Sequence, residues 1–298
     1  MARILIGTAG WSYKDWEGIV YPADEKKRQS LVSYMAQYFD TLEINNSFYR
    51  PIAPNIAKGW ARAAEVNQVF LFTAKLYKAF THAPGAVVQP TSASTIAFTT
   101  EDEQQTKAGL DELAGAGKLG AVLIQFPISF RNTGENRAYL DDLVGRFQQY
   151  PLAVEVRHDS WNHPDTLRSF AEKHVAFCNI DQPLLGKAIR ATAHVTSGVG
   201  YVRLHGRNYQ QWFEHEKSSD RYNYLYSTKE LEGWKEKIER VAEKAGRTFV
   251  VTNNHYKGKA AANALELKSM LAKTRVPAPS SLVSEYPELR ELTQSPPE

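Results

Sequence analysis

Side chains that can exchange protons follow short apolar runs throughout this sequence. They share the ability to act as acid, base or electrophile, and they are Glu43, Lys75, Glu155, Asp181, His205 and His255. In such a set a carboxylate serves as general base, and one of the histidines as the acid or electrophile. The pattern predicts a hydrolase, a lyase or an isomerase.

A second group of polar and aromatic side chains is suited to binding a substrate. Its members are Trp11, Tyr13, Asn45, Tyr49, His82, Gln125, Arg157, Arg203, Arg207, Asn253 and Asn254. Arginine holds phosphate oxygens through two parallel hydrogen bonds, and Lys75 and Lys257 add positive charge. We therefore expect a phosphorylated or otherwise anionic small-molecule ligand.

These side chains are positioned by a repeated unit of a short apolar run, a polar turn and an amphipathic segment. The apolar runs predict strands at Ile4–Ile6, Leu42–Ile44, Val69–Ala74, Ala121–Ile124, Leu152–Val156, Val175–Ile180, Tyr201–Leu204 and Phe249–Thr252. The amphipathic segments predict helices at Leu31–Phe39, Ile56–Glu65, Glu103–Ala114, Arg137–Phe147, Pro164–Lys173, Lys229–Ala245 and Ala260–Leu271, with a weak helical signal after the sixth strand.

The alternation of strands and helices predicts a parallel sheet, because parallel neighbours need a long crossover connection. Eight units predict a single-domain α/β protein, a (β/α)8 barrel of the triose-phosphate-isomerase (TIM) type over residues 1–275. An open doubly wound sheet is the alternative, but no glycine-rich phosphate fingerprint follows the first strand. Residues 276–298 contain Pro277, Pro279, Pro296 and Pro297 and are expected to form a loosely held tail.

Alternation along each strand predicts which side chains face the barrel axis. Val154 and Val156 suit an outer face covered by helices, so Glu155 and Arg157 should point inward. The same reasoning places Glu43, Asn45, Lys75, Gln125, Asp181, Arg203, His205, Asn253 and His255 inward. The carboxyl ends of the strands carry the chemistry in barrels of this kind.

The loops after the last two strands are a common place for a phosphate in such barrels. Arg207 and residues 253–258 fall there. A helix that begins near Lys259 would add backbone N–H groups to the same pocket.

A purely structural role is the competing interpretation of the inward charges. Glu43, Lys75, Glu155, Arg157 and Arg203 can form an ion-pair network that closes the barrel. A carboxylate beside a guanidinium has a depressed pKa and is a poor base at pH 7, so at least one acidic residue should be structural. We expect Glu155 to be that residue.

The same residues resemble those of the YecE-like family, catalogued as domain of unknown function 72. The resemblance runs from Ile4 to Leu271, and its carriers are Gly7-Thr8-Ala9-Gly10-Trp11-Ser12-Tyr13 with Trp16 and Tyr21-Pro22, Glu43-Ile44-Asn45-Asn46-Ser47-Phe48-Tyr49, Lys75 with Thr81-His82, Gln125-Phe126-Pro127 with Ser129-Phe130, Glu155-Val156-Arg157-His158 with Trp161, Asp181, Val202-Arg203-Leu204-His205-Gly206-Arg207, and Asn253-Asn254-His255. This resemblance implies a TIM-type barrel with these motifs at the strand ends, and it implies no reaction.

A divalent metal site is a second hypothesis. Glu155, Asp181 and His205 offer oxygen and imidazole ligands suited to zinc, manganese or magnesium, with Glu43 across the barrel, as in metal-dependent phosphoesterases and isomerases. Arg157 and Arg203 on the same strands would repel such a cation. A retaining glycosidase is disfavoured because Gln125 and His205 stand where a pair of carboxylates would be needed.

A noncatalytic module that binds a nucleotide or single-stranded nucleic acid is the third hypothesis. Aromatic residues among basic ones can stack bases and hold phosphates, and those in the strand-end loops are Trp11, Tyr13, Trp16, Phe48, Tyr49, Phe126, Trp161, Tyr209, Trp212, Phe213, Tyr222, Tyr224 and Tyr226. Packing at the rim is the simpler interpretation for most of them.

Composition limits the remaining classes of protein and the expected cellular location. Cys178 is the single cysteine, which excludes an intrachain disulfide and cysteine-based metal clusters and favours a reducing compartment. The net charge of +3 is too small for a protein that coats nucleic acid. The sequence shows neither a signal-peptide pattern nor a long apolar span, so we expect a cytoplasmic protein without a membrane partner.

Overall fold

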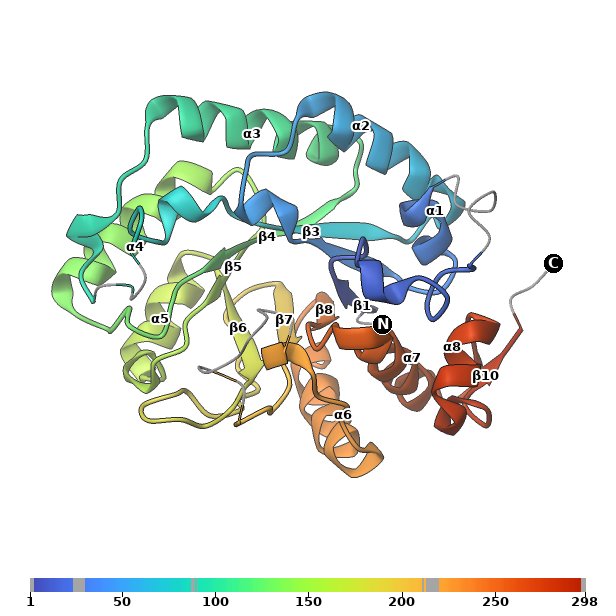
Figure 1. Cartoon of the computed structure of the whole chain (residues 1–298). Coiled ribbons are helices and arrows are strands. Elements are labelled where there is room, and N and C mark those ends of the chain that lie inside the picture. Colours follow the sequence, from blue (N-terminus) through green and yellow to red (C-terminus); the bar gives the residue numbers. More distant parts are fainter. Residues whose placement is uncertain are drawn as a thin grey trace.

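Eight parallel strands close into a barrel in the computed structural model, which describes residues 3–23, 30–86, 89, 91–210, 212 and 220–295 (Figure 1). Each strand pairs with its neighbours in chain order, and β8 closes the barrel against β1. The strands are β1 (Arg3–Ala9), β2 (Thr41–Ile44), β3 (Leu71–Lys75), β4 (Leu119–Gln125), β5 (Leu152–Glu155), β6 (Ala176–Asp181), β7 (Val199–Leu204) and β8 (Arg247–Thr252). The predicted barrel is confirmed.

Helices surround the barrel, as Figure 1 shows for α2 to α7. They are α1 (Leu31–Ala36), α2 (Pro54–Ala63), α3 (Thr100–Gly115), α4 (Gly134–Phe147), α5 (Pro164–Glu172), α6 (Thr228–Ala242) and α7 (Lys259–Ala272). Residues 182–198 connect β6 to β7 without any helix, so the weak signal after the sixth strand did not mark one. Short sequence signals fix several starts: Thr99 and Asp102 form a capping box at α3, and Pro164 occupies the first turn of α5.

The apolar core has two layers. The inner layer includes Tyr201 and Phe249, whose ring centres are 6.0 Å apart, and Gly7 is required in β1 because a Cβ atom there would lie 1.7 Å from the carbonyl oxygen of Thr41. The outer layer lies between the strands and the helices, and it includes the buried aromatic residues Phe72 of β3 and Trp234 of α6. This two-layer packing leaves the carboxyl ends of the strands to carry the polar residues.

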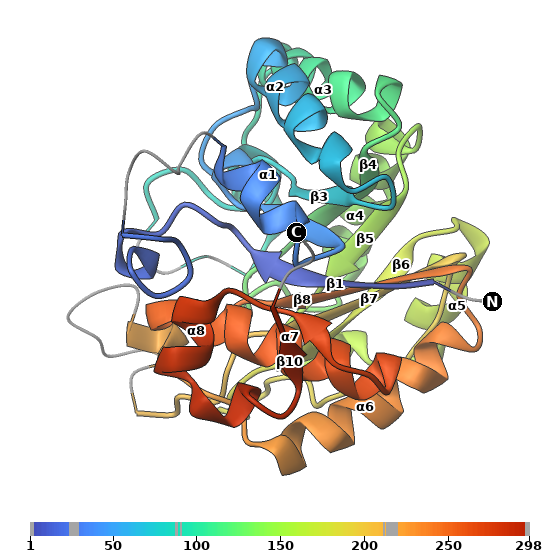
Figure 2. The ribbon, with the colours of Figure 1, turned by 90° about the vertical axis from the view of Figure 1, so that its right-hand side faces the viewer.

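Residues 276–295, the described part of the expected loose tail, form secondary structure and pack on the barrel. It forms β9 (Val276–Pro277), α8 (Ser280–Glu285) and β10 (Thr293–Gln294), and Figure 2 shows α8 and β10 beside α7. Leu282 and Leu289 are fully buried, because their side chains complete the apolar surface over α7. Pro296 and Pro297 lie outside the described residues.

Among the residues that the structure describes, no helix has the length and apolar character needed to cross a membrane.

Candidate active site

Four charged side chains meet inside the barrel in one chain of ion pairs. Arg203 Nη2 donates to Glu43 Oε1 at 2.5 Å, and Arg203 Nη1 donates to Glu155 Oε2 at 2.5 Å. The other oxygen of Glu155 accepts from Arg157 Nε at 2.8 Å. Glu43, Glu155 and Arg203 are all buried, so alternation along β2, β5 and β7 predicted their direction correctly.

Tyr201, which was not among the predicted site residues, adds a hydroxyl group to this cluster. Its hydroxyl donates to Glu43 Oε2 at 2.9 Å and lies 2.8 Å from Thr73 Oγ1. Tyr201 precedes Arg203 by two residues in β7, so the alternation rule could have found it. Both oxygens of Glu43 are therefore engaged.

His205 uses both ring nitrogens to support the cluster. Asn253 Nδ2 lies 3.0 Å from His205 Nδ1, and His205 Nε2 lies 3.2 Å from Glu155 Oε1. An amide nitrogen can only donate, so Nδ1 accepts and the proton on Nε2 points at the carboxylate. Burial, with help from Arg157 and Arg203, lowers the pKa of His205 to about 3, so the ring is neutral at pH 7.

Glu155 is held as a carboxylate. Burial alone would raise its pKa, but Arg203, His205 and Arg157 around it hold that pKa well below the usual value. A carboxylate so stabilised is a poor general base at pH 7. The geometry thus supports the structural role expected for Glu155.

Lys75 stands at the end of β3 without any such partner. Its Nζ lies 4.0 Å from the centre of the Phe48 ring and makes no hydrogen bond or ion pair with the described part of the chain. Burial is the main cause that lowers the pKa of Lys75 to about 7, and Arg203 adds to it while Glu43 and Glu155 oppose it. At pH 7 this amine is divided between its charged and neutral forms.

His82 lies against the same aromatic ring as Lys75. The His82 ring centre is 5.0 Å from that of Phe48, and Thr81 Oγ1 lies 2.8 Å from His82 Nδ1. Burial, followed by the charges of Lys75 and Arg157, lowers the pKa of His82 to about 4. The imidazole is therefore neutral at pH 7 and contacts the same ring as the amine.

Tyr13 and His255 form the opposite side of the barrel mouth. Their rings stack with centres 4.2 Å apart, and the Tyr13 hydroxyl donates to the carbonyl of Ala9 at 2.6 Å. Gly10, with φ of 75°, makes room for this arrangement, since a Cβ atom there would lie 2.5 Å from the hydroxyl oxygen. Burial lowers the pKa of His255 to about 4, and its Nδ1 has no hydrogen-bond partner among the described residues.

Comparison with known proteins identifies the family. A family model described as "Protein of unknown function DUF72" matches residues 5–285. The chain belongs to the DUF72 family. The UPF0759 protein YunF of Bacillus subtilis is 29% identical over 288 residues, covering 90% of this chain and 94% of the relative. This match confirms the resemblance noted in the sequence.

Solved structures of DUF72 proteins have the same fold. One from Thermotoga maritima is 30% identical, superposes with a TM-score of 0.75, and covers 91% of this chain and 99% of its own. One from Enterococcus faecalis, at 24% identity and a TM-score of 0.74, covers 91% of this chain and 96% of its own. None of these names states a reaction or a substrate.

Asp181 does not face the barrel axis of this DUF72 protein, which corrects the sequence prediction. Cys178 and Ile180 pair in register with Tyr201 and Arg203, which point inward, so Asp181 falls on the outer face of β6. There Asp181 accepts from Arg207 Nε at 2.8 Å. Apolar residues occur on both faces of β6, so alternation along this strand did not predict the direction of Asp181.

Arg207, predicted to bind a phosphate, has carboxylate partners in this structure. Besides Asp181, it contacts Glu230 through Nη1 at 2.9 Å, so two carboxylates neutralise it. Gly206, with φ of 87°, turns the chain after β7, immediately before Arg207.

The start of α7 does not support the predicted anion site either. Gly258, which caps α7, is buried, and a Cβ atom on it would lie 3.0 Å from Val20 and 3.1 Å from Ile19. Apolar side chains therefore cover this helix terminus. Lys257 is exposed beside it, and its backbone N–H donates to Asp15 at 2.7 Å.

Six of the thirteen strand-end aromatic residues are buried by packing, the role that the simpler interpretation gives them. Trp11 was predicted to bind substrate, but it packs edge-on against Trp60 of α2 with ring centres 5.2 Å apart. The other buried members are Trp16, Phe126, Trp161, Trp212 and Tyr226. Tyr49 and Tyr209 remain exposed, and Phe213 lies outside the described residues.

The remaining predicted binding residues have different positions. Asn45 is partly buried beyond Glu43, and its Oδ1 is a buried acceptor with no partner in the described structure. Gln125 pairs in register with Glu155 and is partly exposed at the mouth. Asn254 is fully buried, and its Nδ2 donates to Asn263 Oδ1 at 2.8 Å.

The metal hypothesis receives no support from the described residues. They contain no group of three or more histidine, cysteine, aspartate or glutamate side chains placed to hold an ion. Glu155 and His205 do meet, but Asp181 belongs to the separate cluster with Arg207. Arg157 and Arg203 occupy the space around Glu155 where a cation would have to lie.

Proposed function

We propose that this DUF72 protein is an enzyme that binds a phosphorylated or otherwise anionic substrate at the carboxyl ends of its barrel strands. The observation that carries the proposal is the amine of Lys75, which has no hydrogen bond or ion pair with the described residues. A partly buried ammonium group without a counter-ion costs folding free energy, and such groups concentrate at functional sites.

The charge balance at the mouth supports an anionic ligand. Glu43 and Glu155 are matched by Arg203 and Arg157, so a protonated Lys75 leaves an excess of positive charge. Arg157 Nη1 also has no acceptor among the described residues and is available to an anion. A ligand with a negative group between Lys75 and Arg157 would supply the missing partner for both.

Lys75 is also the group best suited to move a proton. An amine whose pKa lies near 7 can accept or release a proton at neutral pH, as a general base or acid must. The carboxylates in the cluster are held by arginines, and His205 is fully buried with both nitrogens occupied. A lyase, an isomerase or a hydrolase with Lys75 as the acid-base group fits this arrangement.

A thermal-shift screen of sugar phosphates, nucleotides and oxo acids tests the proposal. A ligand present at about 100 times its dissociation constant should raise the melting temperature by about 3 °C or more. The Lys75→Met variant should lose this rise. A ligand that stabilises both proteins equally would place the binding site elsewhere.

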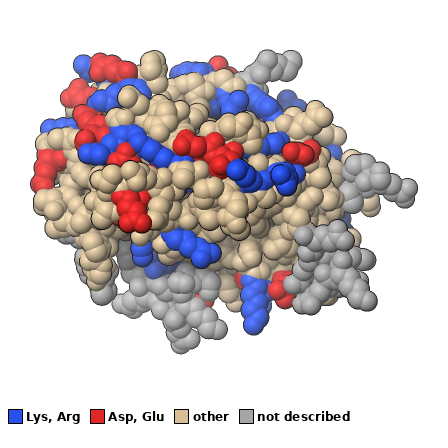
Figure 3. Space-filling view, turned by 90° about the horizontal axis from the view of Figure 1, so that it is seen from above, with Lys and Arg blue, Asp and Glu red and all other residues tan. Residues whose placement is uncertain are grey.

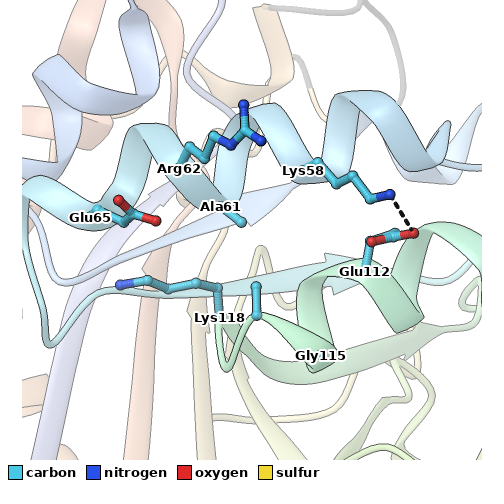
Figure 4. Close-up of a pocket in the computed structure, with 8 residues that line it drawn as sticks. Lys58, Ala61, Arg62, Glu65, Glu112, Gly115 and Lys118 are labelled. Carbon is cyan, nitrogen blue, oxygen red and sulfur yellow. Dashed lines mark ion pairs between the residues drawn. The ribbon is translucent and has the colours of Figure 1, made fainter.

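Lys58→Met is the matched control, because it removes a lysine from the outer surface of the barrel. Lys58 lies between α2 and α3 in a cavity of about 240 Å³ and pairs with Glu112 at 3.3 Å (Figure 4). Lys118 in the same cavity donates to the backbone carbonyl of Asn67 at 3.3 Å. This site holds its own carboxylates, so the control should keep the full ligand response.

A noncatalytic module for nucleotides or single-stranded nucleic acid is the second candidate. It is favoured by Tyr49 and Tyr209, which expose 67% and 49% of their surface. Figure 3 shows acidic and basic side chains intermixed over one face of the molecule. Binding of a short oligonucleotide that is lost in Tyr49→Ala and retained in Lys75→Met would select this candidate.

A further inference from the structure

The amine of Lys75 and the imidazole of His82 both contact the ring of Phe48. Lys75 Nζ lies over the face of Phe48, while the His82 ring meets the same ring edge-on at an interplanar angle of 86°. The two groups are close enough that the charge of Lys75 lowers the pKa of His82. A neutral imidazole therefore contacts the same ring as an amine that has no hydrogen bond or ion pair among the described residues.

The surroundings of Lys75 favour an amine that attacks rather than one that only binds. Lysines become nucleophilic when an apolar surface and neighbouring cations disfavour the charged form. Phe48 supplies the apolar surface, and Arg157 and Arg203 supply the cations. Arg157 remains available to bind an anion, so the two tasks fall to different residues.

We propose that Lys75 forms an imine with an anionic aldehyde or ketone, whose negatively charged group is bound by Arg157. This inference rests on the proposed function above and names its substrate class, a carbonyl carbon adjacent to an anionic group.

The covalent step balances with groups that the site provides. Nζ of neutral Lys75 adds to the carbonyl carbon, and the carbonyl oxygen becomes a hydroxyl group in the carbinolamine. Loss of that hydroxyl with a nitrogen-bound proton releases one water molecule and forms the C=N bond. His82, being neutral, can accept the proton from nitrogen and return it to the departing oxygen.

Reductive trapping tests the inference with two probes of similar size. Glyoxylate is an anionic aldehyde, and acetaldehyde is its uncharged counterpart. Cyanoborohydride delivers hydride to the imine carbon, so glyoxylate leaves a carboxymethyl group and acetaldehyde an ethyl group on the lysine nitrogen. Peptide mass mapping of the full-length protein then gives the labelling rate of each lysine.

Lys78 is the internal control, because it is exposed in the same connection, three residues after Lys75. With glyoxylate at pH 7, Lys75 should be labelled at least about tenfold faster than Lys78, since an amine with a lowered pKa is more often neutral. Acetaldehyde should give a preference for Lys75 that is several-fold smaller. Arg157→Met should reduce the glyoxylate preference to that of acetaldehyde.

The possible results separate this inference from the proposed function. If Lys75 reacts no faster than Lys78, the imine is excluded, and anion-dependent thermal stabilisation lost in Lys75→Met would still uphold the proposed function. If the labelling preference for Lys75 over Lys78 is the same with glyoxylate as with acetaldehyde, an anionic carbonyl substrate is excluded. The comparison of probes uses the unaltered protein, so it decides the question even if Arg157→Met does not fold.

Discussion

At the scale of single residues, the two inward cations Arg203 and Lys75 have opposite surroundings. Arg203 is buried between Glu43 and Glu155, whereas Lys75 faces Phe48 without a counter-ion among the described residues. Removing one partner from a buried ion pair leaves an uncompensated charge, and removing an unpaired amine leaves none. Stability measurements should therefore separate the structural cation from the functional one.

We expect Arg203→Met to lower the free energy of unfolding by about 3–5 kcal/mol. Lys75→Met should leave the free energy of unfolding unchanged or raise it by about 1 kcal/mol, because it removes a poorly solvated amine. Urea unfolding at pH 7 measures both. A large loss of stability in Lys75→Met would show that Lys75 is a structural residue and would remove the basis of its proposed role.

Tyr201 offers a second residue-scale prediction. Its hydroxyl donates to a buried carboxylate, and hydrogen bonds to charged groups contribute about 1.5–3 kcal/mol. Tyr201→Phe should lower the free energy of unfolding by that amount, whereas Tyr49→Phe removes an exposed hydroxyl and should change it by less than about 0.5 kcal/mol. Equal effects of the two variants would mean that Glu43 finds a replacement donor.

At the scale of elements, strand alternation predicted the site where one face of a strand is clearly apolar and the other polar. β5 and β7 alternate in this way, so Glu155 and Arg203 were placed correctly. β6 reads Ala-Phe-Cys-Asn-Ile-Asp, with apolar residues of both parities, and this is why Asp181 was assigned to the wrong face. The partners of Arg207 could not be predicted, because they depend on the turn at Gly206 and on Glu230 in α6.

The C-terminal helix α8 also gives an element-scale prediction. Its prolines suggested a loose tail, but Leu282 is fully buried, and the Tyr286 hydroxyl donates to the carbonyl of Lys257 at 2.7 Å. Leu282→Ala should lower the free energy of unfolding by about 2–5 kcal/mol, the usual range for a buried leucine. Leu184→Ala, at a leucine with 43% exposure, is the control and should cost less than about 1 kcal/mol. Similar small losses in both would show that α8 is detached in solution.

At the scale of the whole molecule, buried neutral histidines link stability to pH. Burial lowers the pKa of His205 to about 3 and that of His82 and His255 to about 4. In the unfolded chain these rings bind protons below about pH 6.5, whereas the folded protein keeps them neutral until far lower pH. The unfolded state therefore binds more protons between pH 6.5 and 4, and the folded state loses stability as the pH falls through this range.

His205 alone should contribute a loss of about 2 kcal/mol between pH 7 and pH 5. Urea midpoints measured at pH 7, 6 and 5 should therefore fall steeply, and they should fall less steeply in His82→Gln, which removes one buried ring at the mouth. His163→Gln, which removes a ring with 59% side-chain exposure, should keep the slope of the unaltered protein. A flat profile between pH 7 and pH 5 would mean that the folded protein protonates these rings readily, and then His82 could not serve as the neutral base beside Lys75.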